Sequence, residues 1–433
     1  MSKNLSFKLK TPKGTQDYYF DYMEKRSYIE NKMRTNFELW GFKEIRTPTF
    51  EYFDSLATGT GQELQESMFR FKDKGGRQLA LRAEMTSPIA RVVATQLRNH
   101  PIPMRMYYLA PMFRYEEPQS GRQREFWHAG IELYGSSLPD ADAEVIAVFI
   151  TTLNGIGLKG LVVELGHVGL FKSIVREAGL SLEEAAAIRR SIDKKDEEGL
   201  ETALKEVDVS STMKDVFRML PNLRGDVGVT KKILDRVENE EVKACIQNIS
   251  DIVKILKLYD LDSYIMVDLG IVRGIDYYTG AVFEGFVQSL GIAVGGGGRY
   301  DDLVAQFGGG SFPATGFAIG VDRCHLALER QGFNFPLKKK PQILVLYIDK
   351  ELKGEAIKIS KSLRENGLST EMDILERKLS KGLERANKMG IPYVVIVGKK
   401  EFEQGEVVVR NMEKEIQEKV KIENIISYLQ EEK

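Results

Sequence analysis

The stretch F-W-H-A-G-I-E-L-Y-G, residues 126–135, decides the fold. Apolar and polar side chains alternate along it, and a period of two is typical of a β-strand with one buried face. The side chains that we expect in the core are Trp127, Ala129, Ile131 and Leu133. The opposite face has a gap at a glycine and carries His128, Gly130, Glu132 and Tyr134. This strand predicts a sheet with one core face and one polar face.

Further strand-like stretches predict its neighbours. M-R-M-Y-Y-L-A-P-M-F-R, residues 104–114, is joined to the first strand by a long polar loop. M-F-R-F-K-D and R-Q-L-A-L-R-A-E, residues 68–84, form a hairpin through a lysine and two glycines. Hairpins in series indicate an antiparallel sheet. A helix precedes them, because Ile29, Met33, Phe37 and Trp40 recur on one helical face that Gly41 ends.

Strand alternation gathers polar side chains on one face. In residues 82–86 it places Arg82 with Glu84 and Thr86, opposite Met85. If the strands are adjacent, one surface of the sheet carries Glu84, Thr86, Arg114, His128 and Glu132. Two carboxylates suit an ammonium or imidazole, and arginines suit phosphate, so we expect a phosphorylated or adenylated amine as ligand. The alternative is that each strand turns a solvated polar face outward.

The chain then changes character twice. Residues 170–250 are charged and helical, and no strand-like run interrupts them, so we expect an inserted helical domain. P-L-K-K-K-P is typical of a linker, and beyond it strands and helices alternate as in a small α/β domain. We expect a discontinuous catalytic domain at 1–169 with 251–335 and the helical insertion at 170–250. A linker at 336–341 then leads to the terminal domain at 342–433.

Composition sets broad limits. The 433 residues include 62 lysines and arginines and 63 aspartates and glutamates, so nucleic acid would have to meet a local basic surface. Cys245 and Cys324 provide no disulfide framework or metal motif. No stretch has 18 consecutive apolar residues, and no signal peptide is recognisable at the N-terminus. We expect a cytoplasmic protein without a membrane partner.

Two arginines lie at positions where we expect a bound anion to compensate their charge. Arg273 lies in G-I-V-R-G-I-D-Y-Y-T-G, residues 270–280, directly after a strand that we expect to be buried, and an unpaired arginine there would cost several kcal/mol. Arg323 lies where a strand turns into a helix, and a helix N-terminus favours an anion; alternatively it pairs on the surface with Asp322. The glycines at 295–298 match no P-loop or Rossmann motif, so they form either a strand that a substrate approaches closely or a turn before a helix.

Metal and nucleophile chemistry find little support. The remaining histidines, His100, His167 and His325, lack neighbours at metal-ligand spacing, so no protein metal site is predicted. No Ser-His-Asp or Cys-His arrangement is legible either.

Taken together, these stretches resemble a class II aminoacyl-tRNA synthetase, and specifically the histidyl-tRNA synthetase family. P-K-G-T-Q-D at 12–17 is similar to the family's N-terminal signature. T-P-T-F-E, which begins at Thr47, is similar to motif 1 and contains its proline, Pro48. F-R-Y-E-E-P-Q-S-G-R-Q-R-E-F at 113–126 resembles motif 2, and G-F-A-I-G-V-D-R at 316–323 motif 3. V-R-G-I-D-Y-Y at 272–278 and G-G-G-R-Y-D at 296–301 resemble motifs specific to the histidine enzyme.

The resemblance implies an α+β fold: a class II antiparallel sheet flanked by helices, with a helical insertion and a C-terminal α/β anticodon-binding domain. It implies that Glu84 and Thr86 hold the substrate amino group and that Glu132 and Tyr278 hold the imidazole. The other implied histidine-binding residues are Met85, His128, Tyr277 and Tyr300. Arg114 and Arg323 would bind ATP phosphates. Arg114 and Arg273 would be catalytic, and Arg273 would lie at the α-phosphate.

Three positions depart from the family pattern, and one raises a geometric question. His128 stands where a glutamine is usual, and its protonation would make binding more pH-sensitive. Ala83 replaces a common proline, and Glu117 occupies a loop position that is often basic. Tyr278 joins Arg273 on one face only if the backbone bulges near Gly274.

The implied activity is ligation of L-histidine to tRNA(His) by a homodimer, through a histidyl-adenylate. ATP would enter with Mg2+ as a substrate complex, and no tightly bound cofactor is implied. Two alternatives share the fold but not the activity: a catalytically silent regulatory subunit of histidine biosynthesis and a sensor of uncharged tRNA. The first characteristically lacks the C-terminal domain, and both tend to lose the arginines and carboxylates that this chain has.

Overall fold

A computed structural model describes residues 9–116, 123–181, 183–271, 278–288, 291–337 and 342–431. The chain divides into two compact units, Met1–Phe335 and Pro336–Lys433, which are described separately. Among the helices within those ranges, none is both long and apolar enough to cross a bilayer.

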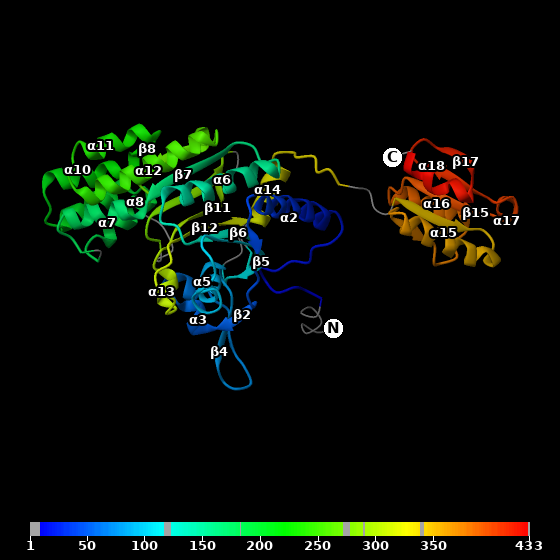
Figure 1. The fold of residues 1–433 in the computed structure, drawn as a ribbon, viewed down its shortest axis with the longest axis horizontal. Coiled ribbons are helices and arrows are strands. Elements are labelled where there is room, and N and C mark those ends of the chain that lie inside the picture. Colours follow the sequence, from blue (N-terminus) through cyan, green and yellow to red (C-terminus); the bar gives the residue numbers. More distant parts are fainter. Residues whose placement is uncertain are drawn as a thin grey trace, which may run out of the picture. The chain divides into compact units, whose positions relative to one another are not determined.

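The first unit is built on a nine-stranded sheet (Figure 1). Its strands are antiparallel neighbours except for the parallel pairs β1–β5 and β7–β9. In spatial order they are β1 (Lys43–Glu44), β5 (Met104–Phe113), β6 (Glu125–Tyr134), β12 (Ala314–Gly320), β11 (Ile292–Arg299), β10 (Ala281–Val287), β7 (Leu161–His167), β9 (Ile265–Asp268) and β8 (Arg224–Gly225). The predicted antiparallel sheet is therefore confirmed.

One face of this sheet is covered by α2 (Asp21–Leu39), α6 (Pro139–Gly155) and α14 (Val321–Arg330) (Figure 1). Ile29, Met33 and Phe37 of α2 are fully buried there, as their helical spacing predicts. The residues of β6 that pack beneath these helices are Ala129, Ile131 and Leu133. The polar face of β6 is therefore turned away from this core.

A small three-stranded sheet and short helices complete the catalytic part. The sheet consists of β2 (Phe50–Tyr52), β4 (Gln78–Leu81) and β3 (Arg70–Lys72), and the helices are α3 (Phe53–Ala57), α4 (Gln62–Glu66), α5 (Thr86–Thr95) and α13 (Leu303–Gln306). The hairpin β3–β4 was predicted, but β4 ends at Leu81. The prediction that Arg82, Glu84 and Thr86 share a strand face is wrong, because the carboxylate of Glu84 binds the backbone N–H groups that begin α5.

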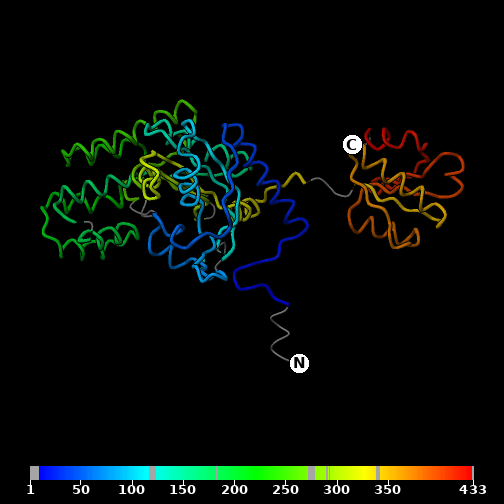
Figure 2. The backbone as a smooth tube through the Cα atoms, turned by 60° about the horizontal axis from the view of Figure 1, so that its bottom comes forward, coloured from blue at the N-terminus to red at the C-terminus, as the bar shows by residue number. Residues whose placement is uncertain are grey.

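Between β7 and β9 the described residues form six α-helices, which gather in one part of the first unit and are green in Figure 2. They are α7 (Val168–Glu177), α8 (Ala186–Lys194), α9 (Glu197–Glu206), α10 (Ser211–Met219), α11 (Lys231–Leu234) and α12 (Glu240–Leu258). The expectation that no strand interrupts this segment is wrong, since β8 pairs with β9 at the edge of the large sheet. Two residues are too few to produce a recognisable alternation in sequence.

The glycines at 295–298 lie inside β11, so the alternative of a turn before a helix is wrong. A side chain at Gly297 would collide with the carbonyl oxygen of Gly316 on β12. Glycine lets the three strands β10, β11 and β12 approach closely at the centre of the sheet.

The second unit is a five-stranded sheet with helices. Its strands, in spatial order, are β14 (Thr370–Met372), β13 (Ile343–Tyr347), β15 (Tyr393–Val397), β16 (Glu406–Asn411) and β17 (Ile416–Lys421). Its helices are α15 (Lys353–Glu365), α16 (Leu379–Lys388), α17 (Lys399–Phe402) and α18 (Ile425–Glu431). The α/β alternation was predicted, whereas the edge strand β17 was not, because five of its six side chains are exposed and it lacks apolar alternation.

Candidate active site

Four residues with predicted roles meet on the polar face of β6, and we call them the acidic cluster: Glu84, Thr86, Glu132 and Tyr300. The carboxylate of Glu132, which is 1% exposed, lies at their centre. The Thr86 hydroxyl donates a hydrogen bond to its Oε1 at 3.0 Å, and the Tyr300 hydroxyl donates to its Oε2. These residues come from three separate stretches of sequence, so only the folded chain assembles them.

Both carboxylates of the acidic cluster are held by neutral donors. Glu84 accepts hydrogen bonds from the backbone N–H groups of Ser87, at 2.9 Å, and Thr86. Burial raises the pKa of Glu84, and burial together with the charge of Glu84 raises the pKa of Glu132 well above its usual range. A cationic amine or an imidazole N–H would offset this burial. The cluster therefore suits a positively charged group.

Two glycines make room for the acidic cluster. A side chain at Gly316 would collide with the Glu132 carboxylate, and one at Gly130 would collide with the hydroxyl of Tyr108. Tyr108 was missed in the sequence, although it lies opposite Gly130 in the β5–β6 ladder. Burial, and then the nearby Glu132 and Glu84, raise the pKa of Tyr108 well above its usual value. The glycine gap in the alternating strand was the signal that could have identified it.

A second group of predicted residues lines a cavity of about 340 Å³ that we call the cationic cavity. Arg114, directly after β5, donates from Nε to the carbonyl of Ala83 at 2.9 Å. Arg323, in the first turn of α14, donates from Nη1 to the carbonyl of Ala293 at 2.7 Å. Burial and then the charges of Arg114 and Arg323 lower the pKa of His128 from 6.5 to about 3. The ring is therefore neutral near pH 7, and the pH sensitivity expected from His128 moves below about pH 4.

Carboxylates and aromatic rings complete the cationic cavity. Glu116, Glu284 and Asp322 line it, and so do Phe126 and Trp127. The described residues contain no group of three metal-binding side chains that could hold a metal by themselves. Glu116 and Glu284 could still add oxygen ligands to a cation that arrives on a phosphate. Neither glutamate was predicted as a site residue, because neither stands in a metal-ligand spacing.

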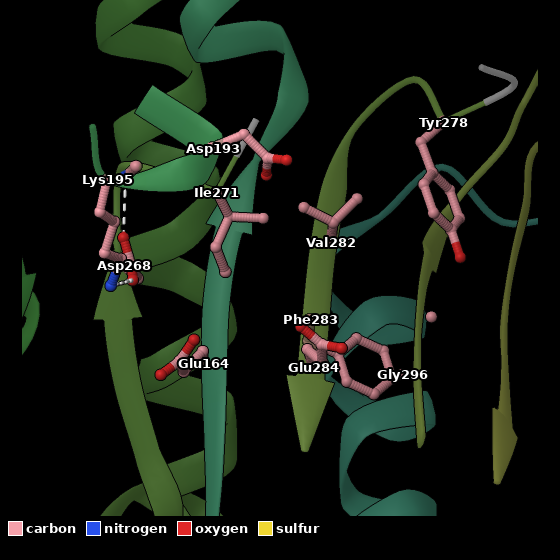
Figure 3. Close-up of a pocket in the computed structure, with 12 residues that line it drawn as sticks. Glu164, Asp193, Lys195, Asp268, Ile271, Tyr278, Val282, Phe283, Glu284 and Gly296 are labelled. Carbon is pink, nitrogen blue, oxygen red and sulfur yellow. Dashed lines mark hydrogen bonds and ion pairs between the residues drawn. The ribbon is translucent and has the colours of Figure 1, made fainter. Parts of the chain in front are cut away.

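An adjoining cavity of about 240 Å³ shares Glu284 and the backbone of Gly296 with the cationic cavity. Tyr278 lines it on one side, and Asp268 and Lys195 lie across from Tyr278 (Figure 3). Lys195 Nζ is 3.9 Å from the Asp268 carboxylate, which also accepts the Gly270 N–H at 2.9 Å. The 168–258 helices thus contribute side chains beside the candidate site.

The remaining predicted residues have different fates. Met85 is 1% exposed and belongs to the core beneath the acidic cluster, where its sulfur accepts the Thr47 hydroxyl at 3.6 Å. Arg273 and Tyr277 lie outside the described residues, as do Gly274 and Glu117, so their expected placements stay predictions.

The acidic cluster and the cationic cavity lie along the same face of the same strand. Glu132 and His128 are four residues apart on β6, which corresponds to roughly 14 Å. An extended ligand with a cationic end and an anionic end would match this arrangement. Amino acids joined to a nucleotide phosphate have these properties.

Comparison with known proteins agrees with this chemistry. A family model described as histidyl-tRNA synthetase matches residues 14–324, and one described as an anticodon-binding domain matches residues 342–432. The Histidine--tRNA ligase of Pyrococcus furiosus is 41% identical over 423 residues, which are 96% of this chain and 98% of that protein.

Solved structures give the same result. A Bacillus halodurans structure, described as an ATP phosphoribosyltransferase regulatory subunit/histidyl-tRNA synthetase, superposes with a TM-score of 0.80 at 28% identity, covering 92% of this chain and 99% of that chain. The apo histidyl-tRNA synthetase of S. aureus gives a TM-score of 0.69 at 27% identity, covering 97% and 99%. The predicted class II α+β fold is confirmed, and the chain belongs to the histidyl-tRNA synthetase family.

Proposed function

We propose that this protein ligates L-histidine to tRNA(His) at the expense of ATP, through a histidyl-adenylate. The observation that carries this proposal is the pairing of a buried acidic cluster with a cationic cavity along one strand face. Family membership and the names of the curated relatives support the same reaction.

Histidine is proposed to occupy the acidic cluster. Glu84 and Thr86 hold its α-amino group, while Glu132 and Tyr278 hold its imidazole. Met85 supports this pocket from the core, and Tyr300 and Tyr277 complete its lining. His128, predicted as a histidine-binding residue, lines the cationic cavity with Arg114 and Arg323, so we assign it to the ATP end. The neutral hydrogen-bond partners of both carboxylates favour this assignment, because a buried carboxylate without a cation gains most from a cationic ligand.

ATP is proposed to bind in the cationic cavity with Arg114 and Arg323 on its phosphates. Phe126 presents a ring that suits the adenine base. Mg2+ enters with the triphosphate and neutralises part of its charge, and Glu116 and Glu284, which line the cavity, are proposed as its oxygen ligands. Arg273 is assigned to the α-phosphate on the strength of the motif resemblance alone.

The reaction has two steps. An oxygen of the histidine carboxylate attacks the α-phosphorus of ATP, and pyrophosphate leaves with the electrons of the broken P–O bond. A terminal ribose hydroxyl of the tRNA then attacks the acyl carbon, and AMP leaves. Positioning and fixed charges supply the catalysis, with no protein nucleophile.

The remaining proposals concern domains and assembly. We propose residues 1–169 with 251–335 as catalytic domain, 170–250 as insertion, and 342–433, after linker 336–341, as the tRNA anticodon-binding domain. A cytoplasmic location is proposed from the two cysteines, which provide no disulfide framework. A homodimer is proposed from the motif 1 resemblance. On the small sheet next to motif 1, Phe50, Tyr52 and Phe71 are each more than two-fifths exposed, which supports an interface there.

The test is histidine-dependent exchange of pyrophosphate into ATP, followed by charging of tRNA(His). Arg273→Ala should slow exchange by about 100-fold or more, the scale for losing one preorganised donor. Arg176→Ala, which removes an exposed arginine paired with Glu241, is the matched control and should retain full exchange. Folded wild-type protein that shows no exchange would favour the catalytically silent regulatory alternatives.

A further inference from the structure

A buried arginine of the N-terminal helix lies behind the cationic cavity. Arg26 of α2 is 3% exposed, and it contacts neither the acidic cluster nor the arginines of the cavity through any hydrogen bond or ion pair given for the described residues. Nothing in the sequence motifs assigns it a role. Burying a guanidinium is costly unless charged partners compensate, so its partners indicate what it does.

Those partners belong to the two segments that present the ATP-binding side chains. The Arg26 guanidinium lies 4.4 Å above the indole ring of Trp127 on β6, and its Nη1 is 3.6 Å from Oδ1 of Asp322 on α14. Its Nε donates to Glu30 at 2.7 Å within α2. Arg26 therefore joins α2, β6 and α14 in the interior.

Asp322 links the two segments directly. Its Oδ2 accepts the backbone N–H of Trp127 at 2.8 Å, while its Oδ1 faces Arg26. Trp127 precedes His128, and Asp322 precedes Arg323, so one carboxylate ties together the backbone positions beside both cavity residues. Arg26 thus places a positive charge beside this partly buried carboxylate.

We propose that Arg26 is a positioning residue for the ATP-binding cavity, holding Asp322 so that Arg323 and His128 are fixed relative to each other. The inference rests on the proposed function, because it assigns Arg26 an effect on ATP and not on histidine. The acidic cluster is at the other end of β6, and within the described part of the chain no hydrogen bond joins it to this network.

The competing explanation is that Arg26 merely docks α2 onto α14. The chain offers a control for that explanation, because Lys25, the preceding residue, pairs with Glu329 of the same helix α14 at 2.8 Å. That pair is partly exposed, and Glu329 lies about two helical turns after Asp322 on α14. Lys25→Met thus weakens the docking of the same two helices without touching the Asp322 carboxylate.

The experiment measures KM for ATP and for histidine in pyrophosphate exchange, with thermal unfolding of each variant. Arg26→Met should raise KM for ATP about tenfold, the effect of weakening one charge-assisted contact, and change KM for histidine less than about twofold. Arg26→Lys should restore part of the loss. Lys25→Met should leave both constants unchanged.

Asp322→Asn keeps an acceptor for the Trp127 N–H but removes the charge that Arg26 meets. It should also raise KM for ATP, and the double variant Arg26→Met with Asp322→Asn should be no worse than the more affected single variant. Additive effects, or equal changes in both KM values, would overturn the proposal even if Arg26→Met folds poorly. Wild-type protein without exchange would instead refute the proposed function.

Discussion

The two ends of the polar face of β6 have opposite electrostatic character. At one end Glu132 and Glu84 are buried among neutral donors, and their pKa values are raised. At the other end Arg114 and Arg323 flank a histidine whose pKa is lowered to about 3. The first end carries two carboxylates and favours a cationic group. The second end combines two guanidiniums with Glu116, Glu284 and Asp322, so it suits a phosphate that arrives together with a cation.

Because of this difference, one strand can bind two substrates, each at its own end. Because an ammonium is disfavoured beside two guanidiniums and a triphosphate is disfavoured beside two buried carboxylates, each substrate is directed to one end. The carboxylate of histidine would then lie between the ends, where it can meet the α-phosphate. Substitutions that neutralise one end should therefore affect one substrate only.

The largest effect is expected at the acidic end. Glu132→Gln keeps the size and one acceptor but removes the charge, so KM for histidine should rise by about 100-fold or more, as when one partner of a buried charge pair is removed. KM for ATP should change little. Exchange kinetics at varied histidine concentration measure this, and an equal rise in both KM values would contradict the separation of the two ends.

The same variant should be more stable than the wild type. The pKa of Glu132 is raised in the folded protein. The contribution of this group to the stability of the fold is therefore full below its unfolded pKa of 4.5, and it is lost as the pH rises through the folded pKa. Replacing the carboxylate removes this loss, and the free energy of unfolding should increase by about 1 kcal/mol at pH 8. Chemical denaturation at pH 5 and pH 8 should show an advantage that grows with pH.

A smaller effect of the opposite kind is expected at the cationic end. Arg323→Met removes one guanidinium from the phosphate site, and KM for ATP should rise roughly 30-fold, the scale of losing a hydrogen bond between charged groups. KM for histidine should stay within about twofold of the wild type. Together with Glu132→Gln this variant forms a matched pair, and each serves as the control for the other.

The smallest effect concerns His128. Since its folded pKa of about 3 lies below 6.5, the ring stays neutral, and its contribution to stability is full above pH 6.5 and is lost as pH falls toward the folded value. His128→Gln should therefore leave KM for ATP nearly constant between pH 6 and 8, while it loses less stability than the wild type near pH 5. If KM for ATP changed sharply near pH 6.5 in the wild type and stayed constant in the variant, His128 would titrate near pH 6.5 and this prediction would be wrong.

Local pattern predicted the parts of the site that lie on regular strands and at their ends. His128 and Glu132 were placed on one face by alternation, and Arg323 at a strand-to-helix junction, and both placements are confirmed. Glu84 and Thr86 were gathered with them for the wrong reason. They belong to a helix start, where a carboxylate binding backbone N–H groups looks in sequence like one more polar position of a strand.

Other features depend on contacts between distant residues and left no local signal. β8 is defined by its pairing with β9, and β17 is an exposed edge strand that lacks apolar alternation. Arg26 resembles any other arginine on a helix until Trp127 and Asp322 are brought to it. The order of strands in the large sheet likewise could not be read from their order in the chain.

That strand order has a consequence for synthesis on the ribosome. β12, β11 and β10 lie between β6 and β7, although β6 and β7 are translated first and the other three follow the entire helical segment. β7 lacks its partner β10 until about residue 287 has emerged, and β6 lacks its partner β12 until about residue 320 has emerged. An unpaired strand edge is prone to association with other chains. The sheet that carries the candidate site is therefore completed only after the helices that interrupt it have had time to fold.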